Sequence, residues 1–162
     1  MVGRFYGRCS LVGTPFPYLD NVNDDFNRES LRIEIDTSLP SQRVIRVLDE
    51  LIELRGAPRP LRLDNGPEFI SAALRQWAQQ HRVELIHIQP GKPTQNAYIE
   101  RFNRTFPTEV LDHYVFIALD EVHRMAEDWR HRYNHDRPCR SLSGLSPVRY
   151  AIAPSALTST SE

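Results

Sequence analysis

The sequence predicts an α/β fold in which helices flank a mixed central sheet. A hairpin comes first: a strand begins near Asn21, a polar turn follows at 23–25, and apolar and charged residues then alternate through 31–36. A helix over 38–55 and a strand at 61–63 come next. This order of hairpin, helix and strand is typical of α/β folds in which the last strand lies parallel to a strand already in the sheet.

The helix after residue 38 is predicted from its boundaries and its apolar stripe. Ser38 is a suitable N-cap, Pro40 suits the first helical turn, and Gly56 ends the helix before Pro58 and Pro60. The residues of the stripe are Val44, Ile45, Leu48, Leu51 and Ile52. This spacing places them on one face of the helix, which we expect to cover the sheet.

Further elements follow downstream. A second helix ends near His81, a strand follows over 83–88, a long helix spans 119–133, and a short helix begins at Ser146. The apolar residues that predict the two longer helices are Leu74, Trp77, Ala78, Leu119, Val122, Met125, Ala126, Trp129 and Tyr133. Strands and helices therefore alternate along most of the chain, which supports the α/β class.

The composition indicates a globular, cytosolic protein. At 162 residues and 40% hydrophobic content, the chain suits one compact domain. No apolar run approaches the roughly 20 residues of a membrane helix, so we expect no membrane partner. Cys9 and Cys139 are too few for a disulfide framework or a zinc site. The net charge of −1 gives no general electrostatic case for nucleic acid, although arginine, which supplies nearly all basic residues, suits phosphate contact.

Two blocks of sequence carry the expected chemistry. In the block Leu-Arg-Leu-Asp-Asn-Gly-Pro-Glu-Phe at 61–69, Asp64 stands at the end of a strand and before a turn. In the block at 89–105, Glu100 stands in the first turns of a helix over about 96–106, after a loop rich in proline and glycine. Carboxylates from a strand end and a helix can converge on Mg²⁺, which prefers oxygen ligands.

Each of these side chains also has an ordinary structural role open to it. Asp-Asn-Gly is a common turn sequence, in which Asp64 hydrogen-bonds to its own turn. Glu100 suits a solvated first helical turn, where the helix dipole favours a negative charge. His87, in the strand before the second block, is either a site residue or a packed one. The residues taken singly leave these alternatives open.

The two blocks together resemble the catalytic core of DDE transposases of insertion sequences and, more distantly, retroviral integrases. Further matching blocks lie in the same order at 24–29, 35–40, 133–138 and 144–147, so the resemblance runs over about 21–150. It implies a ribonuclease-H-like fold, bound Mg²⁺ or Mn²⁺, and DNA cleavage and strand transfer. It also implies that transposon ends, target DNA and other transposase copies are the partners, in a bacterial cytoplasm and at the nucleoid when DNA is bound.

The resemblance assigns the site residues. Asp64 and Glu100 match two of the catalytic carboxylates that bind metal in the family. Around them, the candidates for contact with DNA phosphates or bases are Lys92, Gln95, Asn96, Arg101 and Arg104. Asn65 and Gly66 are expected to shape the loop beside Asp64, whereas Glu68 is expected to lie too far along the chain to be a ligand.

The chain departs from the family near its beginning. The family's first carboxylate stands on the strand before the hairpin, but no Asp or Glu precedes Asp20. Asp24 and Asp25 suit a turn, Asn23 replaces an apolar residue, and Pro107 stands where the family commonly has a basic residue. We therefore expect a degraded first strand, in a truncated or frameshifted copy that lacks the upstream DNA-binding helices.

These observations predict an irregular segment over 1–18, an integrase-like core over 19–153 and a disordered tail over 154–162. The leading hypothesis is a transposase catalytic core that is inactive alone because its first catalytic Asp is absent. The alternative is a non-catalytic remnant that binds DNA or joins transposase multimers. A third hypothesis, a glycosidase-like hydrolase with a carboxylate pair, is disfavoured by the sequences around Asp64 and Glu100.

Overall fold

The computed structural model describes residues 2–6, 9–11, 14–16, 18–36, 38, 40–88, 105–106, 108–114 and 116–153. Its centre is a sheet with the strand order β5-β4-β1-β6-β7. These strands are β1 (Val2–Tyr6), β4 (Tyr18–Asn23), β5 (Ser30–Asp36), β6 (Pro60–Leu63) and β7 (Glu84–His87). A separate small sheet consists of β2 (Cys9–Leu11) and β3 (Thr14–Phe16). The helices are α1 (Ser41–Arg55), α2 (Ala72–His81), α4 (Leu119–His135) and α5 (Pro147–Ile152), with short 3₁₀ helices at Leu111–His113 and Arg140–Leu142.

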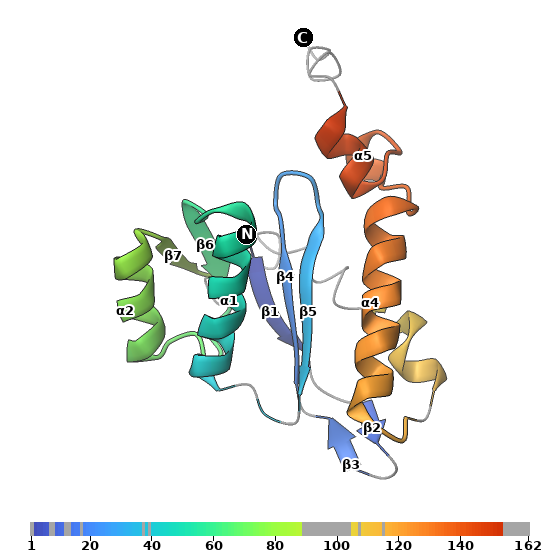
Figure 1. Ribbon diagram of the computed structural model, residues 1–162, viewed down its shortest axis with the longest axis horizontal. Coiled ribbons are helices and arrows are strands. Elements are labelled where there is room, and N and C mark those ends of the chain that lie inside the picture. Colours follow the sequence, from blue (N-terminus) through green and yellow to red (C-terminus); the bar gives the residue numbers. More distant parts are fainter. Residues whose placement is uncertain are drawn as a thin grey trace.

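The central sheet is mixed, as the sequence predicts. β4 is antiparallel to both β1 and β5, whereas β1, β6 and β7 run parallel to one another. The chain passes from β5 to β6 through α1 and from β6 to β7 through α2, because parallel strands need a long crossover. Figure 1 shows α1 and α2 on one side of the sheet and α4 on the other. The prediction of an α/β fold with helices flanking a mixed sheet is therefore confirmed.

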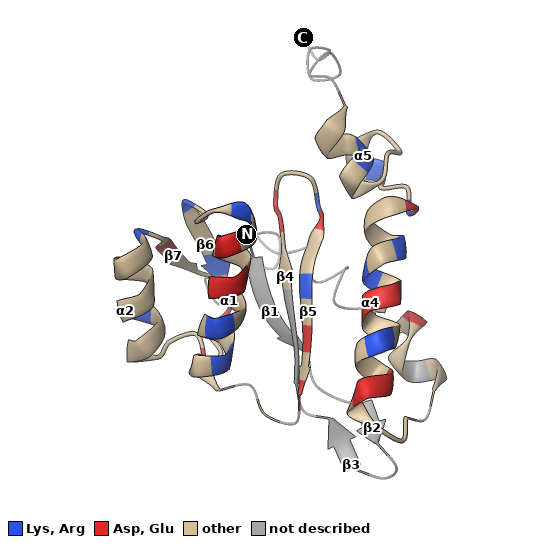
Figure 2. Ribbon diagram, in the orientation of Figure 1, with Lys and Arg blue, Asp and Glu red and all other residues tan. Residues whose placement is uncertain are grey.

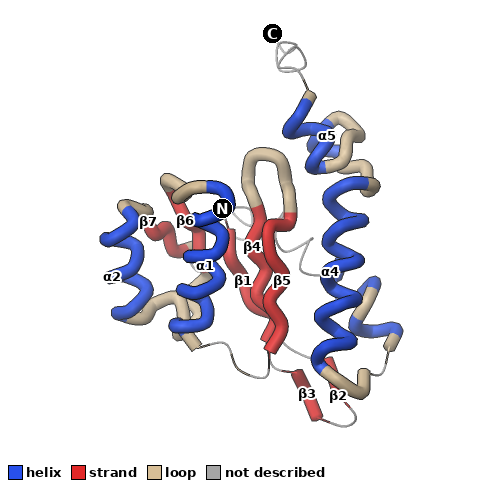
Figure 3. The backbone as a smooth tube through the Cα atoms, viewed as in Figure 1, coloured by secondary structure: helices blue, strands red, loops and turns tan. Residues whose placement is uncertain are grey.

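Each face of the sheet has its own apolar cluster. On the α4 side, Ile33 and Ile35 of β5 are buried in a cluster whose other members are Phe106, Val110, Phe116, Val122, Ala126, Trp129 and Tyr133. On the other side, Leu61 and Leu63 of β6 are buried in a cluster whose other members are Val44, Leu48, Phe69, Leu74, Trp77, Ala78 and Val83. The tube in Figure 3 shows the strands as a layer between these helices.

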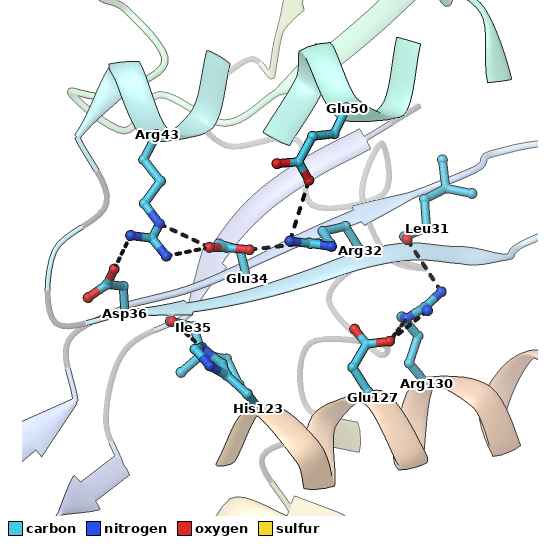
Figure 4. Close-up of polar contacts among 10 residues, drawn as sticks. All are labelled: Leu31, Arg32, Glu34, Ile35, Asp36, Arg43, Glu50, His123, Glu127 and Arg130. Atoms are coloured by element: carbon cyan, nitrogen blue, oxygen red, sulfur yellow. Dashed lines mark hydrogen bonds and ion pairs between the residues drawn. The ribbon is translucent and has the colours of Figure 1, made fainter. Parts of the chain in front are cut away.

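Strand β5 has an apolar face and a charged face. Arg32 and Glu34 flank the buried Ile33, and both interact with α1 (Figure 4). Arg43 of α1 donates a hydrogen bond to Glu34 at 2.7 Å, and Arg32 lies 3.5 Å from the Glu50 carboxylate. Neighbouring residues of a strand point to opposite faces, which is why the alternating pattern correctly predicts this strand.

Helix α4 is attached to β5 by side chains that bind its main chain. Asn134 accepts a hydrogen bond from the N–H of Ser30 at 2.8 Å and donates one to the carbonyl of Ser30 at 2.9 Å. Arg130 donates to the carbonyls of Ser30 and Leu31. The ring of His123 lies 2.7 Å from the carbonyl of Ile35, and Figure 4 shows this contact and the one between Arg130 and Leu31. These contacts run along β5 and fix the helix to it.

An ion pair links the end of α1 to the β4–β5 hairpin. Arg55 donates two hydrogen bonds to the carboxylate of Glu29, and Asn27 donates a third at 3.1 Å. Burial alone would raise the pKa of Glu29, but the bonds from Arg55 and Asn27 outweigh it and hold this pKa below its usual value. The pair therefore stabilises the fold at neutral pH, and its contribution is lost as the pH falls through the lowered pKa of Glu29.

Two helix boundaries differ from the prediction. Helix α1 begins at Ser41, and the preceding Pro40 is extended, so Ser38 is not the N-cap. The carbonyl of Pro40 accepts the N–H groups of Arg43 and Val44 instead. Gly56 does end α1, with a positive φ of 82° that favours glycine. Helix α4 continues past the predicted end to His135.

The prediction that residues 1–18 are irregular is wrong. Strand β1 lies in the middle of the sheet, where it pairs with β4 on one side and β6 on the other. A strand with neighbours on both sides is held by two hydrogen-bonded ladders, so it forms without the alternating pattern that identifies half-buried strands. The first strand of the sheet is therefore present, and β4 begins at Tyr18 rather than at Asn21. The predicted tail at 154–162 lies outside the described residues.

Two buried asparagines differ in how their amides are satisfied. The Asn134 amide makes the pair of hydrogen bonds to Ser30 described above. The Asn23 amide, 2% exposed, has no hydrogen-bond partner among the described residues. Burying a polar group without a hydrogen bond is unfavourable. We therefore expect the polar side chain of Asn23 to lower the stability of the sheet.

We expect Asn134→Ala and Asn23→Val to change stability in opposite directions. Asn134→Ala removes the acceptor of the buried Ser30 N–H, although Arg130 still donates to the Ser30 carbonyl, and should lower the free energy of unfolding by about 1–3 kcal/mol. Asn23→Val removes two unsatisfied atoms from the interior and should raise it by about 1 kcal/mol. Urea denaturation of the two variants and the wild type measures both changes. A loss of similar size in both variants would contradict the assigned difference.

Candidate active site

Asp64 stands directly after β6, at the end of a buried strand. Leu61 and Leu63 of this strand are fully buried, which fixes the position of the residue that follows them. The Oδ1 atom of Asp64 accepts a hydrogen bond from the N–H of Gly66 at 2.9 Å. The turn-forming role that the sequence left open is therefore observed. This hydrogen bond also holds the carboxylate at the end of the strand.

The end of β7 supports the loop that contains Asp64. Asn65 donates a hydrogen bond to the carbonyl of Ile88 at 2.8 Å, and the N–H of Ile88 donates to the carbonyl of Leu63 at 2.9 Å. The Nδ1 atom of His87 lies 3.4 Å from the carbonyl oxygen of Asp64. His87 thus contacts the main chain of the loop, which is a structural contact. Asn65 shapes the loop as the sequence predicts.

Glu68 lies much closer to Asp64 than the sequence suggested. A turn brings the chain back, because the N–H groups of Phe69 and Ile70 both donate to the carbonyl of Gly66. A Cβ atom placed on Gly66 would lie 1.8 Å from a carboxylate oxygen of Glu68 and 3.1 Å from Oδ1 of Asp64. The two carboxylates therefore flank Gly66. The expectation that Glu68 lies too far along the chain is wrong. It was based on the sequence separation from Asp64 and did not include the turn that brings Glu68 back.

The proximity of the two carboxylates is visible in the pKa of Glu68. Burial raises this pKa above its usual value, and the negative charge of Asp64 raises it further. A hydrogen bond to the main chain of Glu68 acts in the opposite direction. The ionised form of Glu68 is thus unfavourable in the folded protein. A positive charge beside Asp64 would relieve part of this cost.

The first strand supplies no carboxylate to this site. Strand β1 pairs with β6 in the register Val2 to Arg62 and Gly3 to Leu63, so its middle lies beside Asp64. Its sequence is Val-Gly-Arg-Phe-Tyr, which contains no acidic residue. The described part of the chain contains no group of three or more His, Cys, Asp or Glu side chains placed to hold a metal ion. The described residues therefore do not fit a site for two divalent ions.

The other predicted site residues lie outside the described residues. They are Glu100, Lys92, Gln95, Asn96, Arg101 and Arg104. Pro107 and most of the predicted helix over 96–106 lie outside them as well. The structure thus positions one of the two predicted catalytic carboxylates, Asp64, and adds Glu68 next to it.

Acidic and basic side chains are mixed across the described surface. Figure 2 shows both signs along α1, β5 and α4. The arginines that form ion pairs with carboxylates are Arg28, Arg32, Arg43, Arg55, Arg62, Arg130 and Arg137. An arginine already paired with a carboxylate attracts a phosphate less strongly. Ion pairs therefore reduce the attraction of this surface for DNA.

A hollow lies near the C-terminal end of α4. It has a volume of about 380 Å³, and its lining includes Glu109, Trp129, Arg132 and Arg137. Within it, Trp129 donates a hydrogen bond to Glu109 at 2.7 Å, and Arg137 donates to the same carboxylate at 2.9 Å. The carboxylate of Glu109 is thus already bound by two side chains of this hollow.

The fold, with an aspartate directly after a parallel central strand, is that of a ribonuclease-H-like α/β domain. The Integrase core domain family matches residues 5–93 and, in a second segment, residues 81–147. The chain belongs to this family. The resemblance to insertion-sequence transposases and integrases that the motifs indicated is thereby confirmed.

Proteins of insertion elements are similar to this chain. An uncharacterised protein of insertion element IS476 from Xanthomonas euvesicatoria is 46% identical over 130 residues, which cover 80% of this chain and 38% of that protein. An uncharacterised protein of IS407 from Burkholderia multivorans is 44% identical over 130 residues, which cover 80% of this chain and 47% of that protein. The chain thus spans less than half the length of these two relatives.

Solved structures share the fold. A chain of the simian T-cell lymphotropic virus intasome superimposes with a TM-score of 0.76 at 18% identity, over 96% of this chain and 54% of that chain. The HTLV-2 integrase catalytic core domain, in its dimeric form and in complex with magnesium, has a TM-score of 0.65 at 14% identity, over 92% of both chains. These similarities confirm the ribonuclease-H-like fold.

We expect Glu68→Gln to stabilise the protein at neutral pH. The pKa of Glu68 is raised, so the folded state binds its proton more tightly than the unfolded state does, and the charged form disfavours folding. Glutamine resembles the protonated form. The melting temperature of the variant should exceed that of the wild type at pH 7, and the difference should vanish below pH 4.5, the usual value for this side chain.

Scanning calorimetry at several pH values measures this difference. Glu53→Gln is the matched control, because Glu53 is exposed on α1 and should show no such dependence. A Glu68→Gln variant that is less stable than the wild type at pH 7 would contradict the unfavourable placement of this charge.

Proposed function

We propose that this chain is the catalytic-core part of an insertion-element transposase, descended from enzymes that cleave and join DNA, and that it does not join DNA alone. Membership of the integrase core domain family and the position of Asp64 support the ancestry. One observation supports the proposed loss of DNA joining: the middle strand β1 lies beside Asp64 and contains no carboxylate.

The chemistry explains why this departure matters. Cleavage and joining of a phosphodiester require charge neutralisation at phosphorus and at the leaving oxygen, which a pair of divalent ions supplies. Such a pair needs a carboxylate shared between the ions. We assign Asp64 and Glu100 as the remaining ligands for Mg²⁺ or Mn²⁺, and the magnesium complex of the HTLV-2 core domain supports this choice of ion. Two ligands alone make a poorer site than three.

The partners follow from the same ancestry. We propose that Lys92, Gln95, Asn96, Arg101 and Arg104 contact DNA at transposon ends or target sites. The dimeric and trimeric forms of the HTLV-2 core domain support self-association or association with an intact transposase. No helix in the described part of the chain is long and apolar enough to cross a membrane. We propose action in the bacterial cytoplasm, at the nucleoid while DNA is bound.

A second candidate is a non-catalytic remnant that binds DNA or joins transposase multimers. The same carboxylate-free β1 favours it, since the fold persists without the first ligand. The two candidates predict different effects on the DNA-joining activity of an intact relative when the two proteins are mixed. A remnant of this kind should enter the relative's multimer and lower its joining activity, whereas an impaired core that acts on its own should leave that activity unchanged.

We expect the purified chain to give no DNA joining. The assay incubates the chain with a pre-cut donor end, target DNA and Mn²⁺, and resolves the products on a denaturing gel. Product should not exceed that of Asp64→Asn, because no carboxylate of β1 completes the metal site. Joining by the wild type that is lost in Glu100→Gln would show that the chain is a complete catalyst.

DNA binding should be weak and strongly dependent on salt. Arginine–phosphate contacts release counterions, so affinity falls as the salt concentration rises. Arg101→Ala and Arg104→Ala should each lower the slope of log affinity against log salt by about 1, without changing sequence preference. Fluorescence anisotropy with labelled duplexes measures both quantities. Arg46→Ala, on the exposed side of α1, is the control. Tight, sequence-selective binding at physiological salt is the opposite result.

A further inference from the structure

We propose that the junction of α4 and α5 is a surface that binds the phosphate groups of DNA. The residues of this α4–α5 surface are Arg132, His135, Asp136, Ser146 and Arg149. The proposal rests on the proposed function, which supplies DNA as the partner. It goes further, because the DNA contacts proposed above all lie within 92–104, in another part of the chain.

The C-terminal part of the chain has a local excess of positive charge. Between Trp129 and Ala153 there are five arginines and one acidic residue, Asp136, whereas the whole chain has a net charge of −1. Figure 2 shows basic residues both in α4 and in α5. A locally positive surface attracts nucleic acid even where the whole protein is not basic. The net charge of the chain therefore does not describe this end of the molecule.

Only some of these arginines are bound to carboxylates within the described part of the chain. Arg130 pairs with Glu127, and Arg137 pairs with Glu109. The exposed arginines of this part that form no ion pair with a described residue are Arg132, Arg140 and Arg149. A guanidinium that has no carboxylate partner keeps its planar fork of donors for a phosphate.

Two hollows adjoin at the end of α4. The hollow described above has Arg132 and Asp136 in its lining. A further hollow of about 260 Å³ has His135, Asp136, Ser146 and Arg149 in its lining. Because Asp136 belongs to both hollows, the two arginines lie on adjoining parts of one surface. Figure 1 shows α5 directly beyond the C-terminal end of α4, which is the arrangement that joins them.

The loop between α4 and α5 is closed by main-chain hydrogen bonds. The N–H of Cys139 donates to the carbonyl of Leu145, and the N–H of Gly144 donates to the carbonyl of Cys139, each at 3.0 Å. Gly144 has a positive φ of 80°, which favours glycine in this turn. These bonds set the start of α5, and with it Ser146 and Arg149, before any ligand binds. A surface formed in advance loses less entropy on binding.

Ser146 has a hydrogen bond left to donate. Its side chain is buried at 4% exposure, its Oγ atom has no hydrogen-bond partner among the described residues, and it does not cap α5. A buried hydroxyl without a partner is unfavourable. Serine hydroxyls are common donors to DNA phosphates. Because Ser146 and Arg149 line the same hollow, one phosphate can accept hydrogen bonds from both.

Asp136 is the member of the α4–α5 surface that opposes an anion. It lines both hollows, and its carboxylate forms no ion pair with a described residue. Its negative charge repels phosphate, so the surface binds DNA less tightly with Asp136 than without it. The proposal therefore predicts changes of affinity in both directions.

Fluorescence anisotropy with labelled duplex DNA and the full 162-residue chain tests these roles. Arg132→Ala/Arg149→Ala should lower the slope of log affinity against log salt by about 2, because each arginine–phosphate contact releases counterions. Arg46→Ala/Arg75→Ala is the matched control. It removes the same charge from exposed positions on α1 and α2 and should leave the slope unchanged.

Two further substitutions change single groups of the surface. Asp136→Asn should raise the affinity for DNA at low salt by about two- to fivefold, the size typical of one exposed charge interaction. Ser146→Ala should lower the affinity by about two- to tenfold, the size of one hydrogen bond, without changing the salt slope, because it removes no charge.

Chemical protection of the unmodified chain locates the contact without any substitution. Phenylglyoxal modifies arginine side chains, and mass spectrometry of peptides measures the modification at each position. Duplex DNA should protect Arg132 and Arg149 and leave Arg46 and Arg75 reactive. Equal modification of Arg132 and Arg149 with and without DNA would overturn the proposal. Equal protection by polyglutamate at the same charge concentration would also overturn it, because the surface would then suit acidic protein segments.

The variants separate this proposal from the proposed function. DNA binding that Arg101→Ala weakens, but that Arg132→Ala/Arg149→Ala changes no more than the control does, would exclude the α4–α5 surface and leave the proposed function in place. A wild-type chain that binds no DNA at low salt would contradict the proposed function itself, and this surface with it.

Discussion

The structure depends on the double pairing of β1. This five-residue strand joins the antiparallel pair β4–β5 to the parallel pair β6–β7, and the parallel side of the join has two register pairs. Helix α1 packs against strands on both sides of β1. Its residues Val47 and Leu51 pack with Val22 and Leu31 of the antiparallel strands. Its residues Val44 and Leu48, in the same turns, belong to the buried cluster that contains Leu61 and Leu63 of β6. One helix thus covers both halves of the sheet, which explains how a short central strand without its own apolar pattern is retained.

The position of Asp64 follows from this arrangement. Burial of Leu61 and Leu63 fixes the position of β6 in the sheet. The hydrogen bonds of Asn65 and Ile88 attach the loop that contains Asp64 to the end of β7. The sheet and the hydrogen bonds of the loop therefore set the position of the carboxylate. A relative with a carboxylate on β1 would place it by the same two ladders. The scaffold for the site can persist after the chemistry has changed.

Sequence patterns predicted the elements whose periodicity reflects a single buried face. Strand β5 and helices α1 and α4 each show an apolar stripe, so their type and order were correct. Strand β1 was missed, because a strand between two neighbours shows no alternation and its pairing partners are distant in sequence. Glu68 was misplaced for a similar reason: the main-chain bonds to Gly66 fold the turn, and residue spacing does not show them. The place of Asp64 at a strand end and in a turn was predicted correctly, because its strand and its turn are both local signals.

The electrostatic environment of Asp64 affects both the stability of the fold and the binding of a metal ion. Two neighbouring carboxylates, Asp64 and Glu68, are unfavourable without a cation, as the raised pKa of Glu68 shows. A divalent ion relieves this repulsion but requires several oxygen ligands at once. The main-chain turn at Gly66 nevertheless keeps Glu68 next to Asp64, because the N–H groups of Phe69 and Ile70 both donate to the carbonyl of Gly66. The fold therefore maintains this carboxylate pair at a cost in stability that a bound cation would reduce.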